Sequence, residues 1–454
     1  MAVSDRKTWR IVGRKRLNGR VAVHGNKNAA LPAMTASLLL PRTGNELVLT
    51  NIPRIRDVMV LTDILAHLGI SSSWDGTDTL RLKRVRMFNR MPDLPREVVS
   101  RIRGSIVLLG PLSGLWKEFT LPKPGGDKIG TRPITAHTSA LADLGVRVSD
   151  RSGVLTVSRA IDPGTAGSLQ VWLTEQSVTA TETVLLHSAF LGRKQSLTVN
   201  GAATEPHIVT LCRVLSAMGA RISGTGSSVL NISWPRGRTR PVRPVRCDDD
   251  FMEATTLAVA AAVSRGNVDI VFRNPGSLEL IDRYLRWMGV RTDILPEKNM
   301  WRIHGARSTL RLNSRLGVIK AEPWPRLPTD VMSAMVVLAT QCRGTVKFLE
   351  YMYDDRFGFA QMLQDMGATI RTEGPHVISV SGPTPLAGNE MLLRPDIRSG
   401  AAMLLAALAA SGTSLLHDRR GVIARGYQDL AASLKGLGAD ITEVSGLFAD
   451  SSQD

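Results

Sequence analysis

A short phrase recurs six times along this 454-residue chain: leucine, two further residues, leucine or methionine, and then glycine. Successive copies lie 70 to 78 residues apart. The glycines that end the copies are Gly69, Gly145, Gly219, Gly289, Gly367 and Gly438. A phrase repeated at so regular an interval is typical of one supersecondary unit used many times, and six copies of one unit constrain the fold more than any other feature.

Each copy predicts the end of an amphipathic helix, because apolar residues at i and i+3 precede a glycine that can adopt a left-handed C-cap. A run typical of a β-strand follows, such as ARIS after Gly219 and ADIT after Gly438. Most units also contain a second helix, rich in alanine on nearly every face, which predicts burial among neighbours. These segments are 28–40, 179–192, 253–266, 329–341 and 399–411.

Six such units predict an α/β fold of two domains with three units each, the alanine-rich helices inside and the sheets outside. The chain is too long for one compact core, and its hydrophobic content of 43% is that of a globular protein. A run rich in proline and arginine, 236–246, lies between the third and fourth units. Proline favours an extended linker there.

The formal net charge of +17 is compatible with nucleic acid, an acidic partner or an anionic substrate. The arginines are dispersed, and no recognisable nucleic-acid motif accompanies the one dense run. We therefore expect a small anionic substrate and no nucleic-acid partner.

The N-terminal segment lacks the apolar stretch of a secretory signal, so a cytoplasmic protein is expected. The most apolar segments fall short of the ~20 residues that span a bilayer, and no membrane insertion is expected. Cys212, Cys247 and Cys342 are widely spaced, so neither a disulfide framework nor a zinc site is predicted.

The segment 122–133, PKPGGDKIGTRP, is rich in glycine and cations and predicts a mobile loop. Its cations Lys123, Lys128 and Arg132 surround a single carboxylate, Asp127. Taken alone, the segment is better explained as a solvated surface loop with scattered charge, and it matches neither a Walker A loop nor a dinucleotide fingerprint.

Other candidates adjoin the predicted buried helices. Lys27 and Asn28 begin the first one, where a lysine must either reach solvent or face an anion. Asp330 occupies a predicted N-cap position, for which capping alone is a sufficient explanation. Further arginines, each explicable as a surface residue, are Arg103, Arg356, Arg398 and Arg425.

Together these segments resemble the enolpyruvyltransferase family, and its UDP-N-acetylglucosamine branch more closely than its shikimate-phosphate branch. The resemblance covers nearly the whole chain and rests on motifs in the family's order and spacing: GNKNAALP, RIRGSI, PGGDKIGTRP, TEPHIV, LPTD, DDRF, DIRSG and RGY. It implies a two-domain inside-out α/β barrel with the active site in the interdomain cleft. The implied division is 27–240 for the first domain, 1–26 with 247–454 for the second, and 241–246 for the linker.

The resemblance also implies roles for individual residues. The phosphoenolpyruvate site would comprise Lys27, Arg132, Arg356, Arg398 and Arg425, whose charges suit a substrate with a phosphate and a carboxylate. The acceptor site would comprise Asn28, Arg103, Arg132, Ser177, Val178, Thr179, Asp330 and Met352. The catalytic groups would be Lys27, Asp127, Asp330 and Arg425. No metal or organic cofactor is implied, and a monomer is expected.

Asp127 stands where many family members have a cysteine and some an aspartate. It is expected to protonate the methylene carbon of phosphoenolpyruvate or to assist product release, although the neighbouring cations are expected to lower its pKa. Asp330 is expected to accept the proton of the attacking hydroxyl. An aspartate at position 127 also predicts resistance to epoxide inhibitors that alkylate the cysteine.

The sequence departs from the family pattern where a nucleotide is expected. Thr135 replaces an aspartate that helps to hold uracil, Glu175 and Gln176 replace a lysine region, and Thr179 replaces a glycine beside the diphosphate. Two acceptors stay open: UDP-N-acetylglucosamine, as in peptidoglycan synthesis, and UMP at its 3'-hydroxyl, as in nucleoside antibiotic synthesis. A non-catalytic nucleotide-binding paralogue is a more distant alternative.

Overall fold

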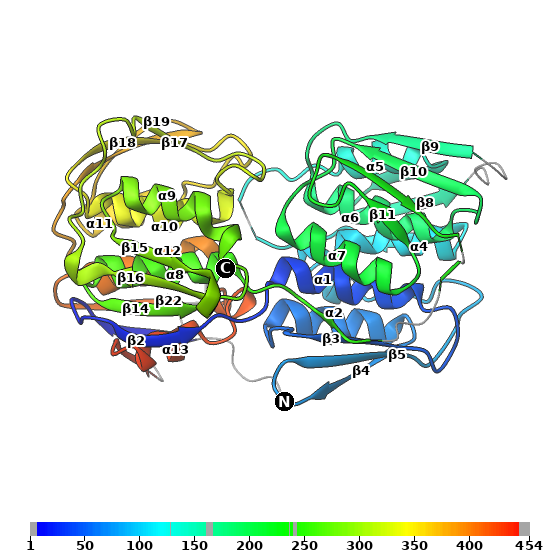
Figure 1. Cartoon of the computed structure of the whole chain (residues 1–454), viewed down its shortest axis with the longest axis horizontal. Helices are drawn as coiled ribbons and strands as arrows, with labels where there is room; N and C mark the ends of the chain where they lie inside the picture. The colour runs from blue at the N-terminus through cyan, green and yellow to red at the C-terminus, as the bar shows by residue number, and fades with distance from the viewer. Residues whose placement is uncertain (1–6, 128, 160–166, 236, 239–242, 445–454) are drawn as a thin grey trace.

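A computed structural model describes residues 7–127, 129–159, 167–235, 237–238 and 243–444. The chain forms two lobes that lie side by side, each with sheets toward the outside and helices between them (Figure 1). Six sheets account for the named strands, three in each lobe. The α/β fold of six repeated units is therefore confirmed.

The first lobe contains the sheets β13-β3-β5-β4, β6-β8-β7 and β11-β12-β10-β9. Their strands are β3 (Glu46–Thr50), β4 (Ile70–Asp75), β5 (Thr79–Arg84), β6 (Glu118–Pro122), β7 (Val146–Arg151), β8 (Val154–Arg159), β9 (Gly167–Trp172), β10 (Gln195–Asn200), β11 (Arg221–Ser223), β12 (Val229–Ser233) and β13 (Val245–Arg246).

The second lobe contains the sheets β15-β16-β14-β2, β17-β18-β20-β19 and β21-β22-β1-β23. Their strands are β1 (Lys7–Val12), β2 (Asn18–Ala22), β14 (Asn267–Val271), β15 (Thr292–Leu295), β16 (Met300–His304), β17 (Val318–Lys320), β18 (Gly344–Leu349), β19 (Thr369–Gly374), β20 (Val377–Gly382), β21 (Glu390–Leu392), β22 (Thr413–Asp418) and β23 (Asp440–Val444). Strands from both ends of the chain thus complete these sheets.

Each repeated phrase ends a helix, as predicted. These helices are α2 (Arg56–His67), α5 (Thr135–Ala142), α7 (Pro206–Ala217), α9 (Glu279–Trp287), α11 (Ala360–Asp365) and α13 (Leu430–Gly436). The six glycines that follow have φ between 77° and 107°, the left-handed region in which a Cβ is strained. A strand follows every one of them.

The alanine-rich segments form buried helices. They are α1 (Lys27–Thr35), α6 (Val178–His187), α8 (Phe251–Val263), α10 (Thr329–Thr340) and α12 (Ile397–Ala409). In the second lobe α8, α10 and α12 pack against one another. The second unit uses a 3-10 turn, η2 (Arg103–Leu108), continued by α4 (Leu109–Leu115), which the alanine pattern did not reveal. The short helix α3 (Arg96–Val99) precedes it.

Two hydrophobic cores follow the two lobes. One includes residues from Ala29 to Cys247, and the other combines Ile11 to Val23 with Phe251 to Ile441. The chain therefore passes between the lobes twice, near residues 23–29 and 247–251. Both crossings lie beside the N-termini of buried helices, which places those helix starts near the interface.

The linker predicted for 241–246 needs correction. Residues 241 and 242 lie outside the described part of the chain, but Val245–Arg246 forms β13 and pairs in parallel with β3. The prolines indicated a linker that belongs to neither domain. Instead, the backbone of these two residues hydrogen-bonds to the open edge of a sheet and becomes part of it. The last residues of that run belong to the first lobe.

The glycines after the repeated helices differ in how much space surrounds them. A Cβ on Gly289 would lie 2.0 Å from the backbone oxygen of Thr309, whereas a Cβ on Gly438 would meet nothing closer than 3.5 Å. We expect Gly438→Ala to cost about 1–2 kcal/mol through backbone strain alone, and Gly289→Ala about 3 kcal/mol or more because a clash is added. Urea unfolding of both variants measures the difference, and equal losses would contradict this account.

Candidate active site

Lys27, Asp57, Asp127 and Arg425 form one charged cluster across the two lobes. Lys27 is the first residue of α1, and its Nζ donates to the Asp57 carboxylate at 3.2 Å. Arg425, at the end of the short turn η7 (Ile423–Arg425), donates from Nε to Asp57 at 3.1 Å and from Nη1 to Asp127 at 2.5 Å. One arginine of the second lobe thus binds two carboxylates of the first.

The electrostatics of Asp127 correct one expectation. Burial raises the pKa of Asp127, and this effect exceeds the lowering by Arg425 and Lys27. The sequence shows the cations but not the loss of water around the carboxyl, which penalises its charged form. A carboxyl with a raised pKa is better suited to donate a proton near neutral pH. Lys128, the next residue of this loop, lies outside the described residues.

A second cluster surrounds Asp330, which is the second residue of α10 and not its N-cap as predicted. Its two carboxylate oxygens bind Arg356 and Arg398, the latter at 3.0 Å. Both arginines are almost fully buried, with 3% and 4% of their surface exposed. Asp330 is therefore held by two guanidinium groups instead of capping its helix.

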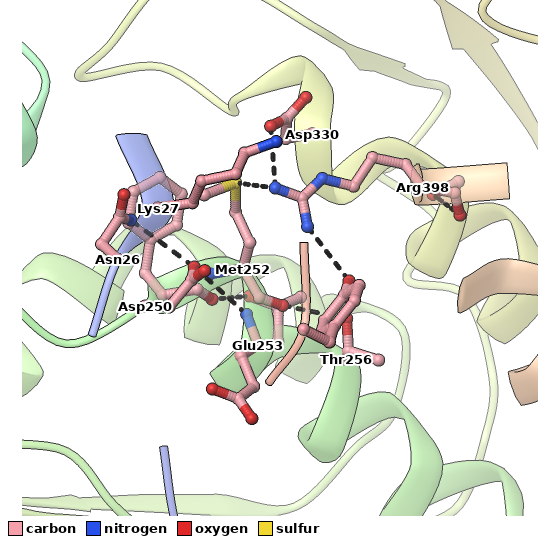
Figure 2. Close-up of polar contacts among 12 residues, drawn as sticks. Asn26, Lys27, Asp250, Met252, Glu253, Thr256, Asp330 and Arg398 are labelled. Carbon is pink, nitrogen blue, oxygen red and sulfur yellow. Dashed lines mark hydrogen bonds and ion pairs between the residues drawn. The ribbon is translucent and has the colours of Figure 1, made fainter. Parts of the chain in front are cut away.

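The position of Arg398 is fixed from several sides. Its Nη1 donates to the hydroxyl of Tyr427 at 3.1 Å, and its Nη2 also contacts the sulfur of Met252 (Figure 2). Asp396, the N-cap of α12, accepts from the backbone N–H of Arg398 at 3.2 Å and binds Arg356 at 3.4 Å. A buried, multiply bonded guanidinium is preorganised for an anion.

The pKa of Asp330 reflects these neighbours. Burial acts to raise it, but the charges of Arg398, Arg356 and Lys27 together hold the pKa well below its usual range. Figure 2 shows the Lys27 side chain extending toward Asp330 and Arg398. Lys27 therefore lies between the two charged clusters, and they form one continuous site.

Two N-cap residues, joined by a hydrogen bond, define the local structure around Lys27. The side chain of Asn26 caps α1 by accepting from the N–H of Ala29 at 3.1 Å, and its amide donates to Asp250 at 3.5 Å. Asp250 in turn caps α8. The N-termini of α1 and α8, which belong to different lobes, are thereby joined next to Lys27. Asn28, the second residue of α1, is half-buried.

Arg103 and Arg132 lie together on the first-lobe side. Arg103 donates to the backbone oxygens of Arg132 and Pro133 at 2.8 and 3.2 Å. Burial, with Arg132 adding to it, lowers the pKa of Arg103 to about 10. The guanidinium of Arg132 lies 5.7 Å from the ring centre of Tyr353, which is equally far from Arg356. The aromatic ring thus connects these cations to the Asp330 cluster.

The start of α6 contains the predicted nucleotide contacts. Ser177 is its N-cap, Val178 its first residue, and the hydroxyl of Thr179 lies 2.8 Å from Nε2 of His137. Burial, with Arg103 second, lowers the pKa of His137 to about 3, so this histidine is neutral at pH 7. Thr179 therefore has a partner at the helix end where an anion would otherwise be placed.

Thr135 and Met352, which the sequence assigns to the acceptor region, lie away from the charged clusters. Thr135 is the exposed first residue of α5. Met352 is half-buried, and its backbone N–H donates to the Glu350 side chain at 2.7 Å. Within the described part of the chain, neither side chain forms a hydrogen bond or an ion pair with the charged clusters.

An interdomain cavity of about 450 Å³ adjoins the start of α6. Gln176, Thr204 and Ser227 line it from the first lobe, and Trp324 and Arg326 from the second. The hydroxyl of Thr204 donates to the backbone oxygen of Trp324 at 2.6 Å, which joins the lobes at this edge. The cavity is large enough for part of a nucleotide.

Several residues of the site escaped the sequence reasoning: Asp57, Asp396, Tyr427, Met252, Tyr353 and His137. Asp57 shows why, because an aspartate in the first turn of α2 is adequately explained by the helix dipole. Its second role depends on Lys27, and on Arg425 from 368 residues further along the chain, both of which bind its carboxylate in the folded protein.

Within the described residues, no cluster of three or more histidine, cysteine, aspartate or glutamate side chains is arranged to bind a metal ion. In the same residues, no helix has the length and apolar character needed to cross a membrane.

Comparisons with known proteins agree on a family. Residues 11–434 match the profile of EPSP synthase (3-phosphoshikimate 1-carboxyvinyltransferase). The UDP-N-acetylglucosamine 1-carboxyvinyltransferase of Borreliella burgdorferi is 35% identical over 438 residues, covering 96% of this chain and 98% of the relative. The enzyme of the same name from Treponema pallidum is 37% identical over 441 residues, covering 95% and 98%.

Solved structures show the same fold. The enolpyruvyl transferase NikO from Streptomyces tendae superposes with a TM-score of 0.81 at 24% identity, covering 97% of this chain and 99% of that one. EPSP synthase from Acinetobacter baumannii gives 0.67 at 17% identity, covering 96% and 100%. With a profile match over most of its length and relatives above 30% identity, the chain belongs to the EPSP synthase family and is an enolpyruvyl transferase.

Proposed function

We propose that this enzyme transfers the enolpyruvyl group of phosphoenolpyruvate to a hydroxyl of UDP-N-acetylglucosamine and releases phosphate. The observation that carries the proposal is the continuous interdomain site in which Lys27 lies between two clusters, one with Asp127 and Arg425 and the other with Asp330 and Arg398. Such a site offers cations for a doubly anionic substrate, together with Asp127, whose raised pKa suits it to donate a proton, and Asp330, which is a deprotonated carboxylate.

Phosphoenolpyruvate would be held by Lys27, Arg132 and Arg425, with Arg356 and Arg398 as a second pair of cations. The latter two are bound to Asp330 in this structure, so a substrate anion has to compete with that carboxylate. Each guanidinium drawn toward the substrate weakens its hold on Asp330. The pKa of Asp330 would then rise, and the carboxylate would become a better base when substrate is present.

The reaction would proceed by addition and elimination. Asp127 donates a proton to the methylene carbon of phosphoenolpyruvate, while the acceptor oxygen bonds to C2 and its proton passes to Asp330. In the elimination step, a proton of the methyl carbon returns to Asp127 as the double bond forms, and phosphate leaves from C2 with the proton held by Asp330, which restores both carboxyl groups. Arg425 contacts Asp127 and is placed to stabilise the departing phosphate.

The acceptor would lie between Arg103, Arg132 and the start of α6, with Asn28 and Asp330 at the reacting hydroxyl. Two observations support UDP-N-acetylglucosamine. Curated relatives at 35% and 37% identity over nearly the full length are named UDP-N-acetylglucosamine 1-carboxyvinyltransferase. A cavity of about 450 Å³ is lined by Gln176, just before the start of α6. A nucleotide sugar requires an extended cleft.

UMP is the second candidate acceptor, and one observation favours it. Thr179 has a side chain at the start of α6 and holds it against His137. A hydroxyl and a methyl group at a helix N-terminus occupy space that a diphosphate would need, whereas a single phosphate requires less.

The acceptor is tested by measuring phosphate release from phosphoenolpyruvate with UDP-N-acetylglucosamine, UMP and shikimate 3-phosphate in parallel, with mass spectrometry of the products. We expect turnover with the first nucleotide and none with shikimate 3-phosphate. Turnover with UMP alone would show that UMP is the acceptor instead of UDP-N-acetylglucosamine. Turnover with neither nucleotide would contradict both.

Thr179 provides a separate prediction about acceptor choice. Thr179→Ala removes the bulk at the start of α6, and we expect the ratio of kcat/KM for UDP-N-acetylglucosamine to that for UMP to rise by about three- to ten-fold. Thr198→Ala, which alters a half-buried threonine of β10, a central strand of its sheet, is the matched control and should leave the ratio unchanged. A ratio unchanged in Thr179→Ala would remove Thr179 from acceptor selection.

A further inference from the structure

His207 is a buried polar side chain that the proposed mechanism does not use. It is the second residue of α7 and belongs to the segment TEPHIV, for which the family resemblance implied no residue role. Only 4% of its surface is exposed, and in the described part of the chain neither ring nitrogen has a hydrogen-bond partner. Buried polar groups of native proteins are nearly always paired, so the unused hydrogen-bonding capacity of this ring requires an explanation.

The ring lies near the carboxylate that is proposed as the base. Burial lowers the pKa of His207 to about 4, against the charges of Asp330 and Asp248, which act to raise it. A histidine of the first lobe is thus close enough to Asp330 of the second lobe to be affected by its charge. Because the imidazole is neutral at pH 7, it offers one N–H donor and one acceptor nitrogen.

The start of α7 borders the interdomain cavity of about 450 Å³. Thr204, three residues before His207, lines this cavity and donates to the backbone oxygen of Trp324 at 2.6 Å. Trp324 lines the cavity from the second lobe, six residues before Asp330. In addition, α7 packs against α1, which begins at Lys27. The segments that border the cavity therefore lead to His207 from one lobe and to Asp330 from the other.

The neutral ring suits the acceptor better than phosphoenolpyruvate. Phosphoenolpyruvate carries a phosphate and a carboxylate, for which the site already provides cations, and a neutral imidazole adds no charge to them. A sugar hydroxyl both donates and accepts a hydrogen bond, as the imidazole does. UDP-N-acetylglucosamine and UMP both carry such hydroxyls.

We propose that His207 is a further acceptor-binding residue, whose ring forms a hydrogen bond with a sugar hydroxyl of the acceptor beside the hydroxyl that reacts at Asp330. This role rests on the proposed function, because it requires an acceptor at Asp330. The ring is covered where the lobes meet, so the acceptor reaches it when the lobes separate at the contact between Thr204 and Trp324.

The test compares stability with acceptor affinity in His207→Leu. Because this change removes no hydrogen bond within the protein, the thermal unfolding temperature should equal or exceed that of the wild type. The dissociation constant of the nucleotide acceptor, measured by isothermal titration calorimetry with UDP-N-acetylglucosamine and with UMP, should rise about ten-fold. The KM for phosphoenolpyruvate should stay unchanged. His207→Gln, which keeps a donor and an acceptor, should recover part of the affinity.

His187→Leu is the matched control. His187 is also buried, and burial lowers its pKa to about 4 as well, but its Nδ1 lies 2.9 Å from the hydroxyl of Ser113 in the core of the first lobe. Loss of this hydrogen bond should lower the unfolding temperature, while the affinity for the nucleotide stays that of the wild type. The two histidines are thus expected to give opposite results.

An unchanged dissociation constant in His207→Leu would overturn the role of His207 and leave the proposed function standing. A lowered unfolding temperature in this variant would also overturn it, because the ring would then support the fold, directly or through a buried water. If the wild type binds neither nucleotide, both His207 as an acceptor-binding residue and the two candidate acceptors are contradicted. Phosphate release by the wild type is measured separately, so failure of the proposed function is recognised independently of His207→Leu.

Discussion

Asp330→Asn is expected to lower kcat by about 10²- to 10⁴-fold, the range for loss of a general base. The amide cannot take the proton of the attacking hydroxyl, and it leaves Arg356 and Arg398 without their carboxylate partner. The expected loss is in kcat and not in folding, because both arginines keep contacts to Asp396 or Tyr427. Phosphate release at saturating phosphoenolpyruvate and acceptor measures it.

Asp269→Asn is the matched control for this variant. Asp269 also pairs with an arginine of the second lobe, Arg302, at 2.6 Å, but on an outer sheet. The Asp269→Asn variant should keep wild-type turnover. A kcat for Asp330→Asn within a factor of two of the wild type would exclude Asp330 as the base.

Asp127→Asn is the second variant with a large expected effect, again about 10²- to 10⁴-fold in kcat. Since burial raises the pKa of Asp127, its protonated form persists to higher pH than that of an ordinary aspartate. An acid must be protonated to act, so wild-type kcat is expected to fall as the pH rises through this raised pKa. Asp127→Asn should lose this dependence along with most of its activity.

Asp127→Cys should keep part of the activity and acquire sensitivity to the epoxide fosfomycin, because a thiolate can be alkylated and the native carboxyl is expected to resist. Intact-mass measurement detects the adduct. Asp150→Asn is the control, since Asp150 binds Lys123 of the same loop on the exposed side, at 2.6 Å. Full activity in Asp127→Asn, or an unmodified Asp127→Cys, would contradict the position assigned to this loop.

The fold was largely predictable because its signals are local. The glycines that end the repeated helices need only their own backbone conformation, and all six have the positive φ that the pattern implies. The alanine-rich helices are likewise identified by a surface that is apolar all round. The unit without such a helix, η2 with α4, escaped because its turn is short and irregular.

The site was predictable as a set of residues but not as an arrangement. Motif order identified Lys27, Asp127 and Arg425, whereas Asp57, which binds two of them, has no motif of its own. The expected lowering of the Asp127 pKa was wrong for the same reason: desolvation depends on which segments pack over the carboxyl.

The sequence by itself determined the repeated α/β units, the glycine-capped helices and the family, since each follows from short-range periodicity or from the order of motifs. Tertiary structure alone decided that Val245–Arg246 completes a sheet, that Asp330 is held by two buried arginines, and that Arg425 of the second lobe binds Asp57 and Asp127 of the first. The physical reason is that hydrogen-bond partners, burial and the summed field of charges depend on distances between residues far apart in the chain.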